Sequence, residues 1–262
     1  ATLGDAHTLA ELKAINNALT GTLTLNDVTV ALTGSAADIK AALAGTFAAG
    51  YTGNVTINDA NGTGIAATDI TAIEAATTGT VTVSNNINLT GTSAEVAAAV
   101  ADVNTFSGTP TATLSNAHTL AELKAINNAL SGTLTLNDVT VALSGSSADV
   151  AAALAGTFAA GYTGNVTTTD AHSTSELIAI NNATTGTITL HDKTVALSGS
   201  ISDIKAALAG TFASSYTGNV TITDGNGTAV TATDLTTIDG DTSGTITAVS
   251  YTHLRAHETL GN

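Results

Sequence analysis

The sequence predicts an α/β solenoid built from strand–helix repeat units, with a largely parallel sheet, helices on one face and an open threonine-rich face on the other. The first observation is repetition: GTLTLNDVTVAL occupies residues 21–32, recurs at 132–143 and returns as GTITLHDKTVAL at 186–197. The second is a set of short runs that alternate apolar residues with threonine. The third is a helix-start signal after these runs.

The repeats have two periods. Residues 1–53 match residues 112–164 almost letter for letter, a period of 111 residues. Within it, a threonine–glycine or serine–glycine signal marks finer units that start near residues 22, 54, 80, 109, 133, 165, 187 and 219. The steps of 22 to 32 residues between these starts lie in the range of solenoid repeats. We therefore expect residues 1–248 to form one repeat array.

The first part of each unit is predicted to be a strand. Alternation is clear at Thr22–Leu25, Thr80–Val83, Thr187–Leu190 and Asn219–Thr223. In such a strand Val, Leu and Ile point to one face and threonine to the other. Strands covered on both faces would instead be continuously apolar. The pattern therefore favours helices on one face over the alternative, a doubly wound domain.

The turns between these elements are less determined. In TLTLNDVTVAL the Asn26–Asp27 pair separates two alternating runs, as either a tight hairpin or a bulged, continued strand. Elsewhere the alternation of strand and helix predicts right-handed crossovers and parallel pairing. The glycines that close units are expected to supply the turn back to the next strand: Gly21, Gly53, Gly79 and Gly108.

The second part of each unit is predicted to be a helix. Capping boxes or acidic first turns occur at Thr8–Glu11, Ser35–Asp38, Thr92–Glu95, Ser173–Glu176 and Thr231–Asp234. In an alanine-rich helix expected over residues 36–49, Ile39, Ala42, Leu43 and Phe47 share one face. Small side chains let such a helix approach the sheet closely.

Composition narrows the classes of function. The net charge of −15, from 21 acidic and 6 basic residues, disfavours nucleic acid and anionic membranes as partners and is compatible with cation binding. Without cysteine there are no disulfides or thiolate metal sites. No apolar run reaches the length of about 18 residues that predicts a membrane span. The start at Ala, without Met, predicts a cut within a longer chain.

The last residues differ from the rest. Val249–Thr259 resembles the translation of a transposase-based sequencing adapter, and the tail contains the only arginine, Arg255. We expect residues 249–262 to be a non-native, disordered tail that plays no part in the fold or the function.

Three histidines occupy one repeat position. His7, His118 and His172 each stand just before a predicted helix, in DAH or NAH. We interpret them as turn residues beside a helix cap, in preference to bases or metal ligands. Because no Ser–His–Asp set is specified, the sequence predicts that the chain is not an enzyme.

The acidic turns contain the candidate metal ligands. Aspartate follows a predicted strand at Asp27, Asp59, Asp138, Asp170, Asp192 and Asp224. In two of these turns Asp-x-Asn-Gly offers two oxygen ligands and a bend, like half of a calcium loop. The candidate ligands are Asp59, Asn61, Asp69, Asp224, Asn226 and Asp234, of which Asp69 and Asp234 come from the following helices. The alternative is an Asx turn without metal. We therefore expect no cofactor other than calcium at these turns.

The threonine-rich face suggests a further function. Thr-x-Thr on consecutive strands predicts a regular array with hydroxyls about 7 Å apart along each strand. Ice binding is one use of such an array, although threonine also solvates a sheet face without charge. Asn-x-Thr sequons occur at Asn54, Asn61, Asn88, Asn165, Asn182, Asn219 and Asn226, and they matter only in a host that glycosylates its surface proteins.

The repeated phrases HTLAELKAINNA, ATTGTITL and YTGNVTITD carry a family resemblance. They resemble tandem repeats of giant secreted or cell-surface proteins of marine bacteria, of the adhesin-like or S-layer-like kind. The resemblance implies a structural or adhesive segment at the cell surface, with neighbouring repeats or cell-surface components as partners. A calcium- or carbohydrate-binding solenoid module is the alternative. We expect the isolated chain to associate end to end.

Overall fold

The computed structural model describes residues 1–225 and 230–248. This part of the chain is a mixed α/β protein with nine helices and four small parallel sheets. Contacts divide it into two compact bodies. The first body comprises residues 1–141 and 152–162, and the second comprises residues 142–151 and the described residues from 163 onward. Asn226 and the tail at 249–262 lie outside the described residues.

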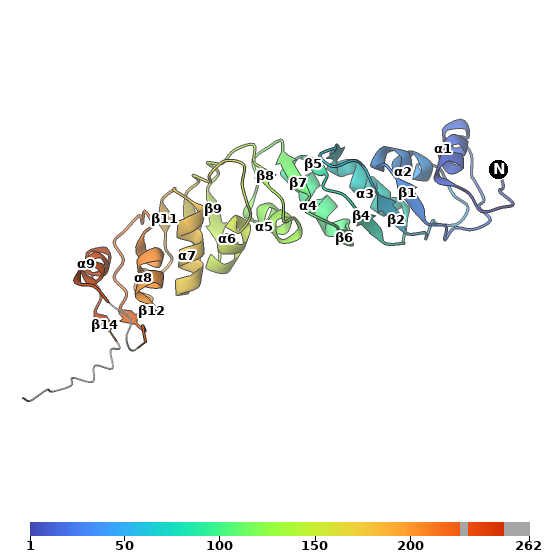
Figure 1. Cartoon of the computed structure of the whole chain (residues 1–262). Coiled ribbons are helices and arrows are strands. Elements are labelled where there is room, and N and C mark those ends of the chain that lie inside the picture. Colours follow the sequence, from blue (N-terminus) through green and yellow to red (C-terminus); the bar gives the residue numbers. More distant parts are fainter. Residues whose placement is uncertain (226–229, 249–262) are drawn as a thin grey trace, which may run out of the picture. The chain divides into compact units, whose positions relative to one another are not determined.

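The first body contains two four-stranded parallel sheets. One sheet has the order β1(Leu32–Gly34), β2(Val55–Ile57), β4(Val81–Val83) and β6(Thr105–Phe106). The other has the order β3(Gly64–Ala66), β5(Asn88–Gly91), β7(Thr111–Leu114) and β8(Leu134–Thr135). Its helices are α1(Leu9–Ala18), α2(Ala36–Leu43), α3(Ala67–Ala76), α4(Ser93–Asp102) and α5(Leu120–Ala129), which follow one another in chain order (Figure 1).

The second body has two three-stranded parallel sheets. Their orders are β11(Ile188–Thr189), β10(Val166–Thr168), β9(Leu143–Gly145), and β12(Leu197–Gly199), β13(Val220–Ile222), β14(Ile246–Ala248). Its helices are α7(Thr174–Ala183), α8(Ile201–Leu208) and α9(Ala232–Asp241). Helix α6(Ser147–Leu154) has residues in both bodies.

Parallel pairing is confirmed for the named strand pairs. Most strands pair with one from a neighbouring repeat unit, as in the register Leu32↔Val55↔Val81. The alternation also predicted burial correctly, because Val81 and Val83 are buried and Thr82, between them, is only partly so. Thr33, Thr56, Thr82 and Thr105 lie in one register across the first sheet.

The strands are shorter than the sequence predicts. The run Thr22–Leu25 forms only isolated bridges, through Leu23 and Thr24. The Asn26–Asp27 segment is not a hairpin, since Asp27 accepts a hydrogen bond from the Thr29 amide at 2.8 Å and the chain continues to β1. Many units instead contribute two short strands to two different sheets, as β2 and β3 do before α3.

Helix starts were predicted well and one helix end was not. Complete capping boxes occur at Thr8, Thr92 and Ser173, and also at Thr119. Helix α2 ends at Leu43 instead of continuing to residue 49. Phe47 therefore lies beyond the helix, where it bridges to Leu23. Among the described residues no helix is both long enough and apolar enough to cross a membrane.

Close approach between units explains most of the glycines that we expected to be turn residues. A Cβ on Gly79 would lie 2.3 Å from the carbonyl oxygen of Gly53, and a Cβ on Gly244 would lie 2.1 Å from that of Gly218. Only Gly108 among the expected turn glycines has a positive φ, of 87°. Beside this contact Thr77 donates from Oγ1 to the Gly53 carbonyl at 2.8 Å and accepts from the Gly79 amide at 3.0 Å. Any Cβ here would separate the two backbones.

Substituting Gly79→Ala should lower the free energy of unfolding by about 1–3 kcal/mol, because the new methyl group meets rigid backbone. The matched control is Gly50→Ala, where an added Cβ has nothing within 4 Å. This control should stay within about 0.5 kcal/mol of the parent chain. Urea denaturation followed by circular dichroism measures both values, and equal losses would contradict the close-approach explanation.

Candidate functional site

Two of the candidate calcium ligands cap helices of a preceding repeat unit. The Asp59 carboxylate accepts a hydrogen bond from the amide of Ala36, the first residue of α2, at 2.7 Å. Asp224 does the same for Ile201, the first residue of α8, also at 2.7 Å. A carboxylate at this position satisfies a free amide and complements the positive end of the helix dipole.

The same position is filled by different residues elsewhere in the chain. Asp170 accepts from the Ser147 amide at 2.7 Å, and Asn116 accepts from the Ser93 amide at 2.7 Å. Since the neutral Asn116 makes the same bond, a hydrogen-bond acceptor is what the position requires. A negative charge is not needed there.

The remaining described candidates have other partners. Asp69 forms an ion pair with Lys40 of α2 at 2.5 Å, and Asp234 forms one with Lys205 of α8 at 2.6 Å. Asn61 accepts from the Asn86 amide at 2.9 Å. Asn226 lies outside the described residues.

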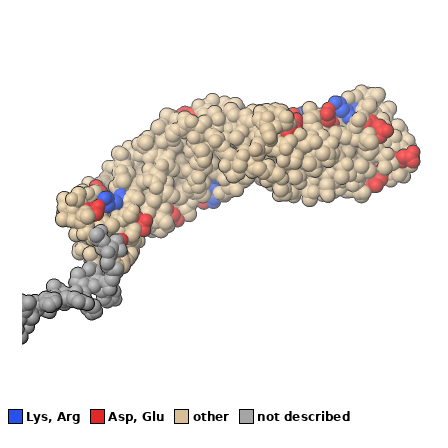
Figure 2. Space-filling view, viewed as in Figure 1, with Lys and Arg blue, Asp and Glu red and all other residues tan. Residues whose placement is uncertain are grey.

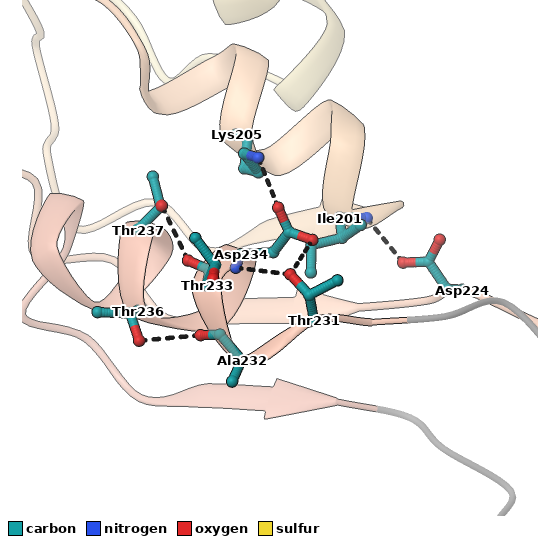
Figure 3. Close-up of polar contacts among 9 residues, drawn as sticks. All are labelled: Ile201, Lys205, Asp224, Thr231, Ala232, Thr233, Asp234, Thr236 and Thr237. Atoms are coloured by element: carbon teal, nitrogen blue, oxygen red, sulfur yellow. Dashed lines mark hydrogen bonds and ion pairs between the residues drawn. The ribbon is translucent and has the colours of Figure 1, made fainter.

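Figure 3 shows the two aspartates of the second candidate site turned to different partners. Asp224 faces the amide of Ile201, while Asp234 lies between Lys205 and Thr231. The pKa of Asp234 is lowered, first by the hydrogen bond from Lys205 and then by that from Thr231. Within residues 1–225 and 230–248 no three His, Asp or Glu side chains are grouped so that they could hold a metal ion. The described contacts therefore account for these carboxylates as caps and ion-pair partners.

Three other acidic turns are Asx turns, the alternative to a calcium loop. Asp27, Asp138 and Asp192 each accept from the amide of the threonine two residues later, at 2.8, 2.7 and 2.8 Å. The threonine hydroxyl donates to the same carboxylate oxygen. These contacts are Asx turns, the alternative that the sequence allowed for the acidic turns.

The three repeated histidines are more deeply placed than turn residues. His7, His118 and His172 are only 5%, 4% and 4% exposed. In each, Nε2 lies within hydrogen-bond distance of a tyrosine hydroxyl, at 3.2 Å from Tyr51, 3.1 Å from Tyr162 and 3.0 Å from Tyr216. Each pair spans 44 residues of sequence. The signal that would have found them is the recurrence of TyrThrGly at this fixed distance after each histidine.

The protonation of these pairs follows from their burial. Desolvation lowers the pKa of each of the three histidines. Desolvation also raises the pKa of Tyr51 to about 12. Each tyrosine hydroxyl lies close to a backbone carbonyl, of Val30, Val141 or Val195, at 2.5, 2.6 and 2.5 Å. At neutral pH the three histidines are therefore uncharged residues of the interior, each beside a tyrosine hydroxyl.

Thr-x-Thr occurs on consecutive strands in the second sheet of the first body. Thr113 of β7 pairs in register with Thr135 of β8, and Thr111 and Thr133 lie two residues before them. Ice binding by such an array stays a prediction. No protein-family model, no curated protein and no solved structure matches this chain.

The helix-cap interpretation predicts different results for two substitutions of one residue. Asp224→Ala should lower the free energy of unfolding by about 1 kcal/mol, whereas Asp224→Asn should retain most of it, as Asn116 does naturally. Thermal melts with added calcium or a chelator provide the comparison. If calcium raised the melting temperature and Asp224→Asn abolished that rise, the carboxylate would be a metal ligand instead.

Proposed function

We propose that the chain is a structural segment of a large extracellular surface protein, in which strand–helix units stack as a solenoid and further units of the same kind join at its ends. One observation carries this proposal. Helices α1 and α5 have the same sequence, LAELKAINNA, yet their apolar residues are buried to different extents.

The comparison isolates the contribution of a preceding unit. In α5 Ile126 is buried, and Leu130, which follows the helix, is 4% exposed. Their counterparts at the first helix are Ile15, which is only half-buried, and Leu19, which is 38% exposed. Helix α5 packs on α4, while α1 packs on α2 and β1. The same side chains are thus covered where a unit precedes them and uncovered at α1.

The strand segment before each of these two helices shows the same difference in burial. Ala112 and Leu114 of β7 are buried between β5 and β8. Their counterparts Ala1 and Leu3 are less buried, and the backbone bonds described for residues 1–3 join them to the segment around Thr24. An open apolar helix face beside an open strand edge is the surface that a further strand–helix unit covers. Helix α4, on which α5 packs, indicates what would fit: a helix whose buried residues are Ser93, Val96, Ala99 and Val100.

The last described helix and strand also leave part of their apolar surface uncovered. Leu235, Thr236, Asp239, Ile246 and Ala248 of α9 and β14 line a depression there. Figure 2 shows that most of the visible face carries neither acidic nor basic side chains. A surface on which charged side chains are few and threonine, serine and asparagine are many suits a spacer or surface layer, in which most contacts are made with neighbouring copies. The placement outside the cell rests on the family resemblance of the repeats.

The proposal predicts self-association of the purified 262-residue chain. Sedimentation velocity over a range of concentrations should show growing oligomers, because each molecule carries an uncovered apolar end. The double substitution Ile15→Lys and Leu19→Lys should shift the chain to monomer by placing charge on the face to be buried. A matched control is Ala121→Lys with Asn128→Lys, two exposed positions of α5. A parent chain that remains monomeric at the highest concentration would contradict the proposal.

A further inference from the structure

We propose that the buried pairs His7–Tyr51, His118–Tyr162 and His172–Tyr216 form an acid-sensitive latch that holds together distant segments of neighbouring repeat units. This inference concerns cohesion within the chain and goes beyond the proposed stacking between chains. Each pair bridges 44 residues, whereas most other side-chain hydrogen bonds between units join residues 20–29 apart. Of the four tyrosines and four phenylalanines in the sequence, three of each gather at these pairs.

The hydrogen bonds determine which histidine nitrogen carries the proton. Each tyrosine has one hydroxyl proton, and it is donated to a valine carbonyl, as from Tyr51 to Val30 at 2.5 Å. The hydroxyl oxygen can then only accept from the histidine. The imidazole Nε2 must therefore be the N–H donor, at 3.0–3.2 Å in the three pairs. In this neutral tautomer Nδ1 carries a lone pair and no proton.

The second imidazole nitrogen has no partner among the described residues. Nδ1 of His7, His118 and His172 is buried without a hydrogen bond in all three copies. Protonation would place a new N–H donor and a positive charge at this atom, where no acceptor meets it. An unsatisfied buried donor is costly, and an unsatisfied buried charge costs more. The folded chain therefore resists the protonation that the unfolded chain accepts freely.

Carboxylates lie near each imidazole and oppose this effect. Asp27 and Glu11 face His7, Asp138 and Glu122 face His118, and Asp192, Glu176 and Asp170 face His172. Their charges favour the imidazolium, but desolvation outweighs them in all three cases. The Glu11 carboxylate is engaged by Thr8 and the Asp27 carboxylate by Thr29, so neither accepts a hydrogen bond from Nδ1.

The direction of the pH effect follows from linkage. In the unfolded chain a histidine has a pKa of about 6.5, and in the folded chain the pKa of these histidines is lower. At a pH above about 6.5 they are neutral in both states and do not change the free energy of unfolding. As the pH falls below it, the unfolded chain binds protons that the folded chain does not bind. The unfolding equilibrium constant then rises by up to about tenfold per pH unit for each histidine, until the folded pKa is reached. Carboxylates with lowered pKa values, such as Glu11 and Asp27, lose their stabilising effect only near and below about pH 4, the unfolded carboxyl range.

Urea denaturation of the full chain at pH 7.5, 6.5, 5.5 and 5.0 tests the latch. The parent chain should lose stability between pH 6.5 and 5.0, and the triple variant His7→Gln, His118→Gln, His172→Gln should lose far less, because glutamine keeps an N–H donor and does not titrate. The control His191→Gln changes an exposed histidine and should behave as the parent does. A parent chain of constant stability over this range, or a triple variant with the parent's pH dependence, would overturn the proposal.

A second measurement keeps the test valid if the triple variant does not fold. Nitrogen-15 NMR of the imidazoles in the parent chain reports the tautomer and the protonation state directly. Three histidines should show a protonated Nε2 and a bare Nδ1 at pH 7, and these signals should persist below pH 6 until the chain unfolds. Signals that convert to imidazolium near pH 6.5 in the folded chain, or that show a protonated Nδ1 at pH 7, would reject the latch.

Discussion

Backbone hydrogen bonding between neighbouring repeat units is the constraint on which the rest of the structure depends. The amide of Leu32 donates to the carbonyl of Asn54, and the amide of Val55 donates to that of Thr80, at 2.9 and 2.8 Å. Because the partner of each strand lies in the next unit, every loop must bring two backbones to strand spacing. The glycine contacts and the Thr77 bridge are direct results of this requirement.

Polar side chains mainly serve the contacts between units. Asn16 donates to the Ala42 carbonyl at the end of α2, and Asp59 accepts from its first amide. Lysine–aspartate pairs such as Lys40–Asp69 join successive helices, although their exposure limits what they add to stability. The acidic composition thus reflects, in large part, capping and pairing within the fold. A motif of two oxygen ligands is a weak indication of metal when the same oxygens meet backbone amides.

The sequence predicted the local features and missed those that depend on the neighbouring unit. Alternation at Val81–Val83 predicted which face of the strand is buried, and Thr8 with Glu11 predicted a helix start. Both predictions were possible because each signal is contained in a few adjacent residues. The end of α2 at Leu43 was missed, although Gly45 just beyond it is a helix-stop signal that the sequence contains. Asn16 of the preceding unit meets the chain there, since it donates to the Ala42 carbonyl. The cap from Asp59 and the burial of His7 likewise depend on partners more than 20 residues away.

The decapeptide shared by α1 and α5 has a consequence for how the chain reaches its native register. Each copy fits the site of the other equally well, so the helix itself gives the folding chain no means of telling them apart. The distinction comes from the neighbouring units, since α5 packs on α4 before it, and α2 is succeeded by α3, in which Ile70 and Ile73 are buried. Differences among units therefore protect a repetitive chain from mispairing and from exchanging segments with its neighbours during synthesis.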